Sequence, residues 1–334
     1  MPTQQIMSEK IYRDSDVDDS ILKGKTLAVI GYGIQGKAQA ANTRDSGFKV
    51  IIGCRGPEDG SKSREQAKAD GFESFSIADA TKKADVLLIE LADPVQPAIY
   101  KREIGPNLRA GQTLCFCHGF SVLYGQIQPP KDVNTVLFVP NAPGAFVREK
   151  YKKGEGVYGC VAVDNDATGD GEKIALAISK AVGSTRAGVV LMSFQHETEG
   201  DNFEEQILYG GAIALMRACF NTMVDNGYSP SFAYAKAIRS IRSVIDVMDE
   251  IGIEAYVSGG CSRTCEFAIR TRGPRVINLD EIKKIFAETE RGEFARDWMQ
   301  EWALGMPTLH RIRRTEHNSK MEQTGRQWRK EFGK

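Results

Sequence analysis

The chain has 334 residues, 41% of them hydrophobic and 26% charged, which is long enough for two domains with a substantial core. Lysine plus arginine equals aspartate plus glutamate at 44 each, and the resulting zero net charge argues against a protein built mainly to bind nucleic acid or an anionic membrane. No apolar run approaches the length that spans a bilayer, and the polar, acidic N-terminus lacks the apolar core of a signal peptide. These features predict a cytoplasmic protein.

The seven cysteines do not have the pattern of a disulfide framework or a zinc site. Their number is odd, and no two of them form a C-x-x-C pair. The four histidines also lack the spacing of metal ligands. Most of the cysteines are therefore expected to be small apolar side chains in the core.

A strand, a tight glycine turn and a helix are predicted over residues 26–42, and the turn has the pattern G-x-G-x-x-G. The first glycine lets the chain turn off the strand, the second lets a pyrophosphate approach bare backbone, and the third lets the helix pack close to the strand. The helix N-terminus then presents free N–H groups to the phosphates. An ordinary glycine-rich turn is the competing interpretation, which the strand–turn–helix context disfavours. The cofactor-binding residues predicted here are Gly31, Tyr32, Gly33, Ile34, Gln35 and Gly36.

The end of the next predicted strand, residues 49–53, bears on the choice of cofactor. An NAD site usually has an acidic residue about 20 residues past the glycines, where it binds the ribose hydroxyl. This chain has Arg55 after the strand instead, and Ser61 and Ser63 follow in the loop. A positive charge and hydroxyls suit a 2′-phosphate, so we expect NADPH. A solvated charged loop is a real alternative for the neighbouring Lys62.

Strands and helices alternate as far as residue 192, which predicts a doubly wound α/β sheet, a Rossmann domain over residues 1–192. Asp93 and Gln96 follow a strand at the carboxyl edge of this sheet, where ligands sit, and are predicted to contact the cofactor. Besides residues 26–30 and 49–53, the predicted strands are 85–91, 113–117, 135–139, 157–163 and 187–192, and further helices are predicted near 63–70, 77–84 and 169–182.

Beyond residue 192, long amphipathic stretches replace the β-branched runs, so an all-α second domain is predicted over residues 193–334. The tail from residue 305 has eight lysines and arginines against three acids, which favours a solvated helix or a partner-facing surface over a nucleic-acid site. The predicted helical stretches are 199–226, 230–251, 279–290 and 292–304.

Two candidates for substrate chemistry end strands at the carboxyl edge of the sheet. His118 can lie near a nicotinamide and act on a substrate proton, although a lone histidine is more often structural. The segment 140–144, which ends in Gly144, faces the same crevice.

Asp201 and Glu205 open the first helix of the second domain and share one of its faces at i, i+4. Such a pair can hold a hard cation or serve as acid and base. It can equally be an acidic helix start favoured by the dipole, and the spacing does not decide between these interpretations.

Many blocks of this sequence, in one order, are similar to the short-form (class I) ketol-acid reductoisomerases from Lys10 almost to the end. The matching blocks are KGK at 23–25, GYG at 31–33 with QG at 35–36, RDSG at 44–47, GSKS at 60–63, HGF at 118–120, GQI at 125–127 before PPKDV at 129–133, GSTRAGV at 183–189, ETE at 197–199, GPRVI at 273–277 and GEFARDW at 292–298.

The resemblance implies an N-terminal Rossmann domain, a knotted helical C-terminal domain, and a homodimer or larger assembly with active sites shared between chains. It also implies NADPH binding through Arg55, Ser61 and Ser63. Members of the family use two Mg²⁺ ions to drive an alkyl migration in an acetohydroxy acid, and NADPH then reduces the resulting ketone. The family's first pair of metal ligands matches Asp201 and Glu205, which are residual candidates for a metal here.

The second pair of metal ligands in the family has no match in this chain. Counting from the block GYSP at 227–230, the two glutamate positions hold Lys236 and Ser240. The family's active-site lysine is Asn141 here, and its substrate-contacting serine is matched to Cys261. Exchanging two carboxylates for an ammonium and a hydroxyl changes the formal charge by about +3, which should repel a second Mg²⁺. Lys236 is then expected to pair with Asp201 or Glu205 across the subunit interface.

These departures favour an NADPH-dependent reductase without the isomerase step, which transfers hydride to a C=N bond, an activated C=C bond or a ketone. The predicted catalytic residues are His118, Asp201, Glu205, Lys236 and Cys261. Binding of Mg²⁺ is doubtful on this interpretation. A genuine reductoisomerase with a metal site rebuilt from Glu197, Glu199 or Asp246, and a non-catalytic NADP-binding sensor, are the alternatives.

Overall fold

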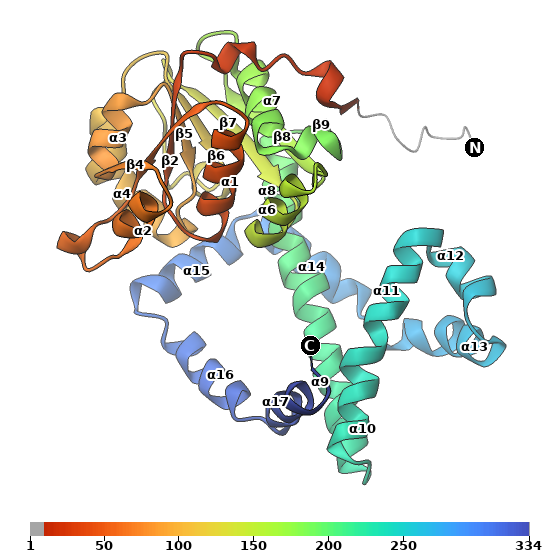
Figure 1. The fold of residues 1–334 in the computed structure, drawn as a ribbon. Coiled ribbons are helices and arrows are strands. Elements are labelled where there is room, and N and C mark those ends of the chain that lie inside the picture. The colour runs from red at the N-terminus through yellow and green to blue at the C-terminus, as the bar shows by residue number, and fades with distance from the viewer. Residues whose placement is uncertain (1–9, 334) are drawn as a thin grey trace. The chain divides into compact units, whose positions relative to one another are not determined.

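The computed structural model describes residues 10–333 (Figure 1). The chain divides into two compact units, Met1–Gly200 and Asp201–Lys334. This division falls inside helix α8 (Phe194–Phe203), whereas the sequence pattern places the boundary just before that helix. The domain limits 1–192 and 193–334 therefore stay a prediction.

The first unit contains a single nine-stranded sheet with the order β1-β9-β8-β7-β6-β5-β2-β3-β4. The dinucleotide strand β2 lies inside the sheet, where it pairs in parallel with β3 and β5. The strands are β1 (Ile11–Tyr12), β2 (Thr26–Ile30), β3 (Lys49–Gly53), β4 (Glu73–Phe75), β5 (Val86–Ile89), β6 (Thr113–Phe116), β7 (Asn134–Pro140), β8 (Gly159–Asn165) and β9 (Val189–Leu191).

The Rossmann half of the sheet agrees with the prediction, and its far half adds features that the sequence pattern does not reveal. Strand β8 runs antiparallel to β7, so the sheet is mixed. Strand β1 lies in the part expected to be a polar lead-in, and it pairs antiparallel with β9. Strand β4 extends the other edge, next to β3. Both added edge strands are too short to show a periodicity of two.

Helices cover both faces of the sheet, and alternate strand residues face two separate cores. On one face Leu27 and Val29 pack with residues of α1 and α7; on the other Ala28 and Ile30 pack against α3. This alternation is what a strand buried on both sides requires. The helices are α1 (Ile34–Asp45), α2 (Ser63–Ala69), α3 (Ile77–Lys83), α4 (Gln96–Ile99), α5 (Phe120–Leu123), α6 (Gly144–Lys152) and α7 (Gly171–Val182).

The second unit is helical across its described residues, which confirms the predicted all-α part. Helix α8 continues into it through a π-helical segment, Glu204–Tyr209. Its other helices are α9 (Gly210–Asp225), α10 (Pro230–Tyr234), α11 (Ser240–Ile251), α12 (Ile253–Ala255), α13 (Arg263–Arg272), α14 (Leu279–Glu290), α15 (Glu293–Ala303), α16 (Pro307–His317) and α17 (Lys320–Phe332). The basic tail therefore forms two helices.

The continuous helical run Phe194–Asp225 corrects the expectation that no apolar stretch is long enough to span a bilayer. By length and composition alone it is apolar enough to cross a membrane, and only 6% of its most apolar window is buried inside the single chain. The helix of a subunit interface passes the same test, because its apolar face is exposed until a partner covers it. Length and apolar composition thus identify a helix with an exposed apolar face, and they do not by themselves indicate a membrane-spanning segment.

Candidate functional site

The three glycines of the dinucleotide turn have the geometry that a bound pyrophosphate requires. Gly31 has a φ of 104°, and a Cβ there would lie 2.6 Å from the carbonyl oxygen of Glu90. A Cβ on Gly36 would lie 2.4 Å from the carbonyl oxygen of Gly31, so helix α1 packs directly onto the turn. Gly33 has open space in front of it, with no heavy atom within 4 Å of an added Cβ. The residues present therefore fit a dinucleotide cofactor.

Two side chains of the turn, Tyr32 and Gln35, form hydrogen bonds with neighbouring parts of the first unit. The buried Tyr32 hydroxyl donates a hydrogen bond to Oδ2 of Asp70 at 2.8 Å. Gln35 donates from Nε2 to the carbonyl oxygen of Ala142 at 2.9 Å. Among the six residues predicted from this turn, the glycines and the N-terminus of α1 offer the backbone to a ligand, whereas Tyr32 and Gln35 direct their side chains to the protein.

Gly144 belongs to the same construction. It is the first residue of α6, and a Cβ there would lie 2.3 Å from the carbonyl oxygen of Ile34. Helices α1 and α6 therefore meet at their N-termini, a contact that only glycine permits. Gly144 shapes the cofactor turn by this close approach, and Ile34 itself is 76% exposed.

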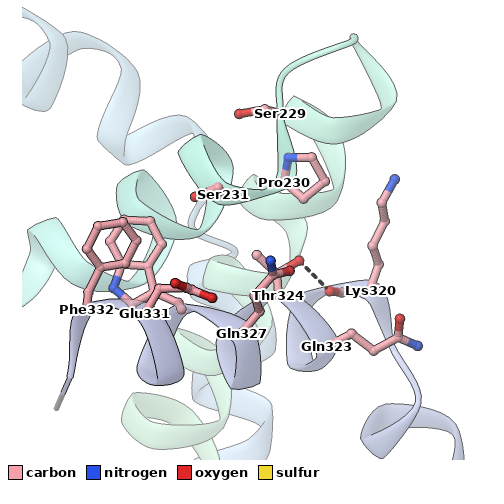
Figure 2. A pocket seen from close by; sticks show the side chains of 10 residues that line it. Ser229, Pro230, Ser231, Lys320, Gln323, Thr324, Gln327, Glu331 and Phe332 are labelled. Atoms are coloured by element: carbon pink, nitrogen blue, oxygen red, sulfur yellow. Dashed lines mark hydrogen bonds between the residues drawn. The ribbon is translucent and has the colours of Figure 1, made fainter.

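One hollow in each unit can be compared with the predicted site residues. A groove of about 510 Å³ beside α1 and α6 is lined by residues that include Tyr32, Ile34 and Gly144. The other, of about 490 Å³, lies between the start of α10 and helix α17 (Figure 2). None of the predicted site residues lines this second hollow, whose walls are mainly hydroxyl, amide and aromatic side chains.

The loop after β3 gathers the residues predicted for a 2′-phosphate. Arg55 is exposed directly after the strand. The hydroxyl of Ser61 donates to that of Ser63 at 3.1 Å and accepts from the Ser63 backbone N–H at 3.2 Å. Sequence reasoning missed Arg64, which pairs with Glu58 and donates to a backbone carbonyl at the end of the strand. The contacts of Arg64 thus stabilise the loop, whereas the side chain of Arg55 is exposed to solvent.

His118 is held by a carboxylate that the sequence assigned to the cofactor. Its Nδ1 lies 2.9 Å from Oδ2 of Asp93. Gln96 is 2% exposed and donates from Nε2 to Oδ1 of Asp93 at 3.2 Å and to the carbonyl oxygen of Leu91 at 2.8 Å. The loops after β5 and β6 therefore bring Asp93, Gln96 and His118 into one hydrogen-bonded chain.

Glu90 is a buried carboxyl group that sequence reasoning missed. It follows β5 directly, beneath the dinucleotide turn, and its Oε2 is enclosed with no hydrogen-bond partner among the described residues. Burial raises its pKa to about 7, and a hydrogen bond from Cys117 lowers the pKa to a lesser degree. The neighbouring thiols of Cys115 and Cys117 have pKa values well above normal, because they are buried and lie near this carboxyl group.

Asp201, Glu205 and a third acid, Glu204, all interact with the phenol of Tyr209. The pKa of Tyr209 is raised first by a hydrogen bond with Glu204, then by burial, and then by the charges of Asp201 and Glu205. Glu204 is a carboxylate that sequence reasoning did not single out. The π-helical segment Glu204–Tyr209 carries these side chains, and such segments often occur at functional sites.

Lys236 and Cys261, also predicted to be catalytic, lie in or beside other π-helical segments. Lys236 lies within Ala235–Arg239, with its Nζ 5.4 Å from the ring centre of Phe232. The hydroxyl of Ser240 donates to the carbonyl oxygen of Lys236 at 2.6 Å, so it is engaged within its own helix. Cys261 directly follows Tyr256–Gly260, and partial burial and Cys265 raise its pKa. The pairing of Lys236 with Asp201 or Glu205 stays a prediction.

Two family models together match almost the whole chain. Residues 21–188 match the model described as "Acetohydroxy acid isomeroreductase, NADPH-binding domain". Residues 194–334 match "Ketol-acid reductoisomerase, C-terminal domain". The chain belongs to the ketol-acid reductoisomerase family. Its N-terminal unit is therefore the NADPH-binding domain of this family, and the protein is an oxidoreductase, as the sequence resemblance implies.

Individual relatives of the ketol-acid reductoisomerase family agree over nearly the full length. The chain is 42% identical over 328 residues, 97% of its length and 98% of the relative's, to "Ketol-acid reductoisomerase (NADP(+))" of Methanocaldococcus jannaschii. It is 40% identical to a solved NADH-preferring ketol-acid reductoisomerase from an uncultured archaeon, with a TM-score of 0.92 over 97% of this chain and 100% of that one. A semialdehyde dehydrogenase NAD-binding protein from Cupriavidus necator, 18% identical over 82% of this chain and 99% of its own with a TM-score of 0.64, shares the fold alone.

These relatives bear on the reaction expected from the sequence. A full-length relative that is named a ketol-acid reductoisomerase favours the reductoisomerase alternative over the reductase without isomerisation that the sequence led us to prefer.

The donor set does not fit two metal ions held by carboxylates alone. Lys236 and Ser240 stand at the second pair of expected ligands, and residues 10–333 contain no group of three or more histidine, cysteine, aspartate or glutamate side chains arranged to hold a metal ion.

Proposed function

We propose that this protein catalyses the ketol-acid reductoisomerase reaction, the NADPH-dependent conversion of an acetohydroxy acid such as 2-acetolactate. The observation that carries the proposal is the 42% identity, over 97% of the chain, to a protein named ketol-acid reductoisomerase (NADP(+)). The two family models support it, because one matches the cofactor domain and the other the helical domain.

The cofactor would lie along the dinucleotide turn. Gly33 leaves room for the pyrophosphate, and the N-terminus of α1 supplies backbone N–H groups. Arg55, Ser61 and Ser63 are proposed to bind the 2′-phosphate with one guanidinium and two hydroxyls. When bound, NADPH supplies a hydride.

The substrate is proposed to lie where His118 can move a proton to or from a hydroxyl or carbonyl oxygen. Asp201 and Glu205 are proposed as further residues that orient the substrate, with or without a single cation. Lys236 supplies a positive charge near an acidic substrate, and Cys261 fills space beside it.

A second candidate function is hydride transfer without alkyl migration, to a ready-made ketone, an imine or an activated C=C bond. The observation that favours it is the exchange of two expected glutamates for Lys236 and Ser240, which removes two anionic oxygens from the place where Mg²⁺ needs them. The reductoisomerase proposal therefore requires other acids in their place. Of those considered, Glu199 already accepts a hydrogen bond from Gln195 at 2.9 Å, and Asp246 is exposed.

Two substrates separate these candidates. Oxidation of NADPH is followed with 2-acetolactate and, separately, with the 2-keto-3-hydroxy acid that its methyl migration yields, each with and without Mg²⁺. The reductoisomerase proposal expects oxidation with both substrates. Oxidation with the rearranged ketone alone, or with a cyclic imine, supports the second candidate. NADPH binding without turnover of any acceptor supports the sensor and overturns both.

We further propose a cytoplasmic homodimer with shared active sites, joined through the helical unit. Helix α9 buries only Phe220 within the chain and α11 buries none of its residues, while Ile213, Leu215, Ile241 and Ile245 are exposed. A second copy of the same chain is the occupant that covers such faces most simply. Light scattering should give twice the chain mass of 36.8 kDa, and a mass of one chain would contradict the dimer.

A further inference from the structure

Asp93 carries a role that neither the sequence pattern nor the comparisons assign to it. The sequence places it among the cofactor contacts, yet its carboxylate lies against a ring nitrogen, with Oδ2 of Asp93 2.9 Å from Nδ1 of His118. The two side chains are 24% and 20% exposed, so water competes only weakly for this hydrogen bond. A carboxylate in this position accepts the Nδ1 proton.

We propose that Asp93 is a positioning residue, which holds the imidazole of His118 in the tautomer with its proton on Nδ1, and that Gln96 fixes Asp93 for this task. The inference deepens the proposed function, on which it rests, because it explains how His118 is kept ready for proton transfer. In the neutral ring the lone pair then lies on the second nitrogen, Nε2.

The hydrogen bonds of Gln96 fix which oxygen of Asp93 faces the histidine. Its amide Nε2 serves two acceptors, the carbonyl oxygen of Leu91 at 2.8 Å and Oδ1 of Asp93 at 3.2 Å. Two acceptors require the NH₂ end of the amide, so the orientation of Gln96 is determined by its partners. Because Oδ1 is engaged by Gln96, Oδ2 is the oxygen that remains for His118.

The histidine ring is also fixed by its surroundings. Its plane is tilted by 32° to the ring of Phe120, with 5.8 Å between the ring centres. The next residue, Gly119, lies so close to α8 that an added Cβ would be 2.0 Å from Oγ1 of Thr198. The backbone beside His118 is thus held by packing, and the hydrogen bond that Asp93 accepts at Nδ1 favours the proton on that nitrogen.

This arrangement predicts an unusual consequence of Asp93→Asn. Gln96 still demands an acceptor, so the amide oxygen of the substituted side chain faces Gln96 and its NH₂ group faces His118. An NH₂ group donates to Nδ1, and the ring proton must therefore move to Nε2. The substitution keeps the shape of the side chain but reverses the tautomer of the histidine.

The test is ¹⁵N NMR of the histidine side chains in the full-length protein, without and with NADPH, at a pH where the ring is neutral. The chain has four histidines, so comparison with His118→Gln assigns the resonances. We expect the wild type to carry the proton on Nδ1 and Asp93→Asn to carry it on Nε2. Asp79→Asn, which alters a carboxylate bonded to the hydroxyl of Ser76, is the matched control and should leave His118 unchanged.

Kinetics and binding provide the second readout. Asp93→Asn should lower kcat by about 10- to 100-fold, a fraction of what general acid–base catalysis contributes, while KM and the Kd of NADPH change less than about threefold. Gln96→Met, which frees Asp93 without altering its charge, should lower kcat less than Asp93→Asn does. Asp93→Glu should fail to restore kcat, because its longer side chain cannot satisfy both partners.

An unchanged tautomer in Asp93→Asn would overturn the inference, and so would a Kd for NADPH raised tenfold or more with the tautomer intact, since Asp93 would then be the cofactor contact expected from the sequence. The NMR result does not depend on turnover. If the wild type converts neither acetohydroxy acid nor ketone, the proposed function fails while the tautomer still decides the role of Asp93.

Discussion

Glu90 lies against Gly36, so that a Cβ on Gly36 would come within 3.3 Å of the Cβ of Glu90. A carboxyl group is therefore enclosed directly beneath the turn that is proposed to receive a pyrophosphate. Burial raises its pKa to about 7 from a normal value of 4.5, so it is close to half protonated at neutral pH.

The raised pKa of Glu90 predicts that stability falls with rising pH. The folded protein holds this proton up to about pH 7, whereas the unfolded chain releases it near pH 4.5, so between these values the folded state binds more protons. The contribution is fully present below pH 4.5 and lost as the pH rises through 7, and amounts to roughly 3 kcal/mol. Glu90→Gln should remove this slope in chemical unfolding experiments between about pH 4.5 and 7.

Glu73→Gln provides the control, because Glu73 is an exposed glutamate on the edge strand β4 of the same sheet. It should retain the slope of the wild type. If Glu90→Gln retains the slope as well, Glu90 does not titrate as its burial implies.

The loop after β3 predicts a change in cofactor preference. Ser63→Asp places a negative charge beside the proposed 2′-phosphate, and repulsion should raise the Kd of NADPH by about 10- to 100-fold, or about 1.4 to 2.8 kcal/mol. NADH lacks this phosphate, so its Kd should change little. Fluorescence titration measures both. Lys62→Ala in the same loop should leave both values nearly unchanged if Lys62 is solvated, and an equal loss of NADPH and NADH in Ser63→Asp would contradict the proposed contact.

Glutamates at positions 236 and 240 are predicted to raise the affinity of the protein for Mg²⁺. Replacing both by glutamate lowers the formal charge there by about 3 and restores two oxygen ligands, so Mg²⁺ affinity should rise at least about tenfold in calorimetry. Arg239→Glu with Ser243→Glu makes the same change of charge at adjacent positions and should give a smaller gain. Equal gains in the two double variants would mean that only bulk charge matters.

A side chain at position 325 is predicted to disturb the packing of the helical unit. An added Cβ there would lie 2.8 Å from Cε2 and 2.9 Å from the hydroxyl of Tyr234, although glycine is otherwise unfavourable inside a helix such as α17. Gly325→Ala should therefore destabilise the protein, by about 1 to 3 kcal/mol, where helix propensity alone would stabilise it. Thermal unfolding measures the difference, with Gln323→Ala on the same helix as the control. An increase in Tm would show that Tyr234 moves aside freely.

The sequence predicts the parts of the fold whose signals are local. Strand β2, the glycine turn and helix α1 follow from a buried run, three glycines at fixed spacing and a helical pattern. The long helices of the second unit follow from their periodicity. Strand β1 has only two residues and exists because β9, far along the chain, offers it a partner, so no local pattern could reveal it.

The site shows the same limit. His118 and Asp93 each follow a strand at the carboxyl edge, which sequence alone recognises, but their hydrogen bond depends on how two loops meet. In the sequence Glu90 is one residue within an apolar run, and its enclosure depends on Gly36 above it. The gathering of Asp201 and Glu205 around Tyr209 depends on a π-helical segment that the helical periodicity does not distinguish.

The identity of the product from 2-acetolactate tests the proposed reaction most directly. After incubation with NADPH and Mg²⁺, ¹³C NMR locates the two methyl groups of the dihydroxy acid. The reductoisomerase proposal predicts a product with both methyl groups on the carbon at position 3, because one of them has migrated before reduction. A product with one methyl group on position 2, which direct reduction of the ketone gives, or no product at all, would contradict it.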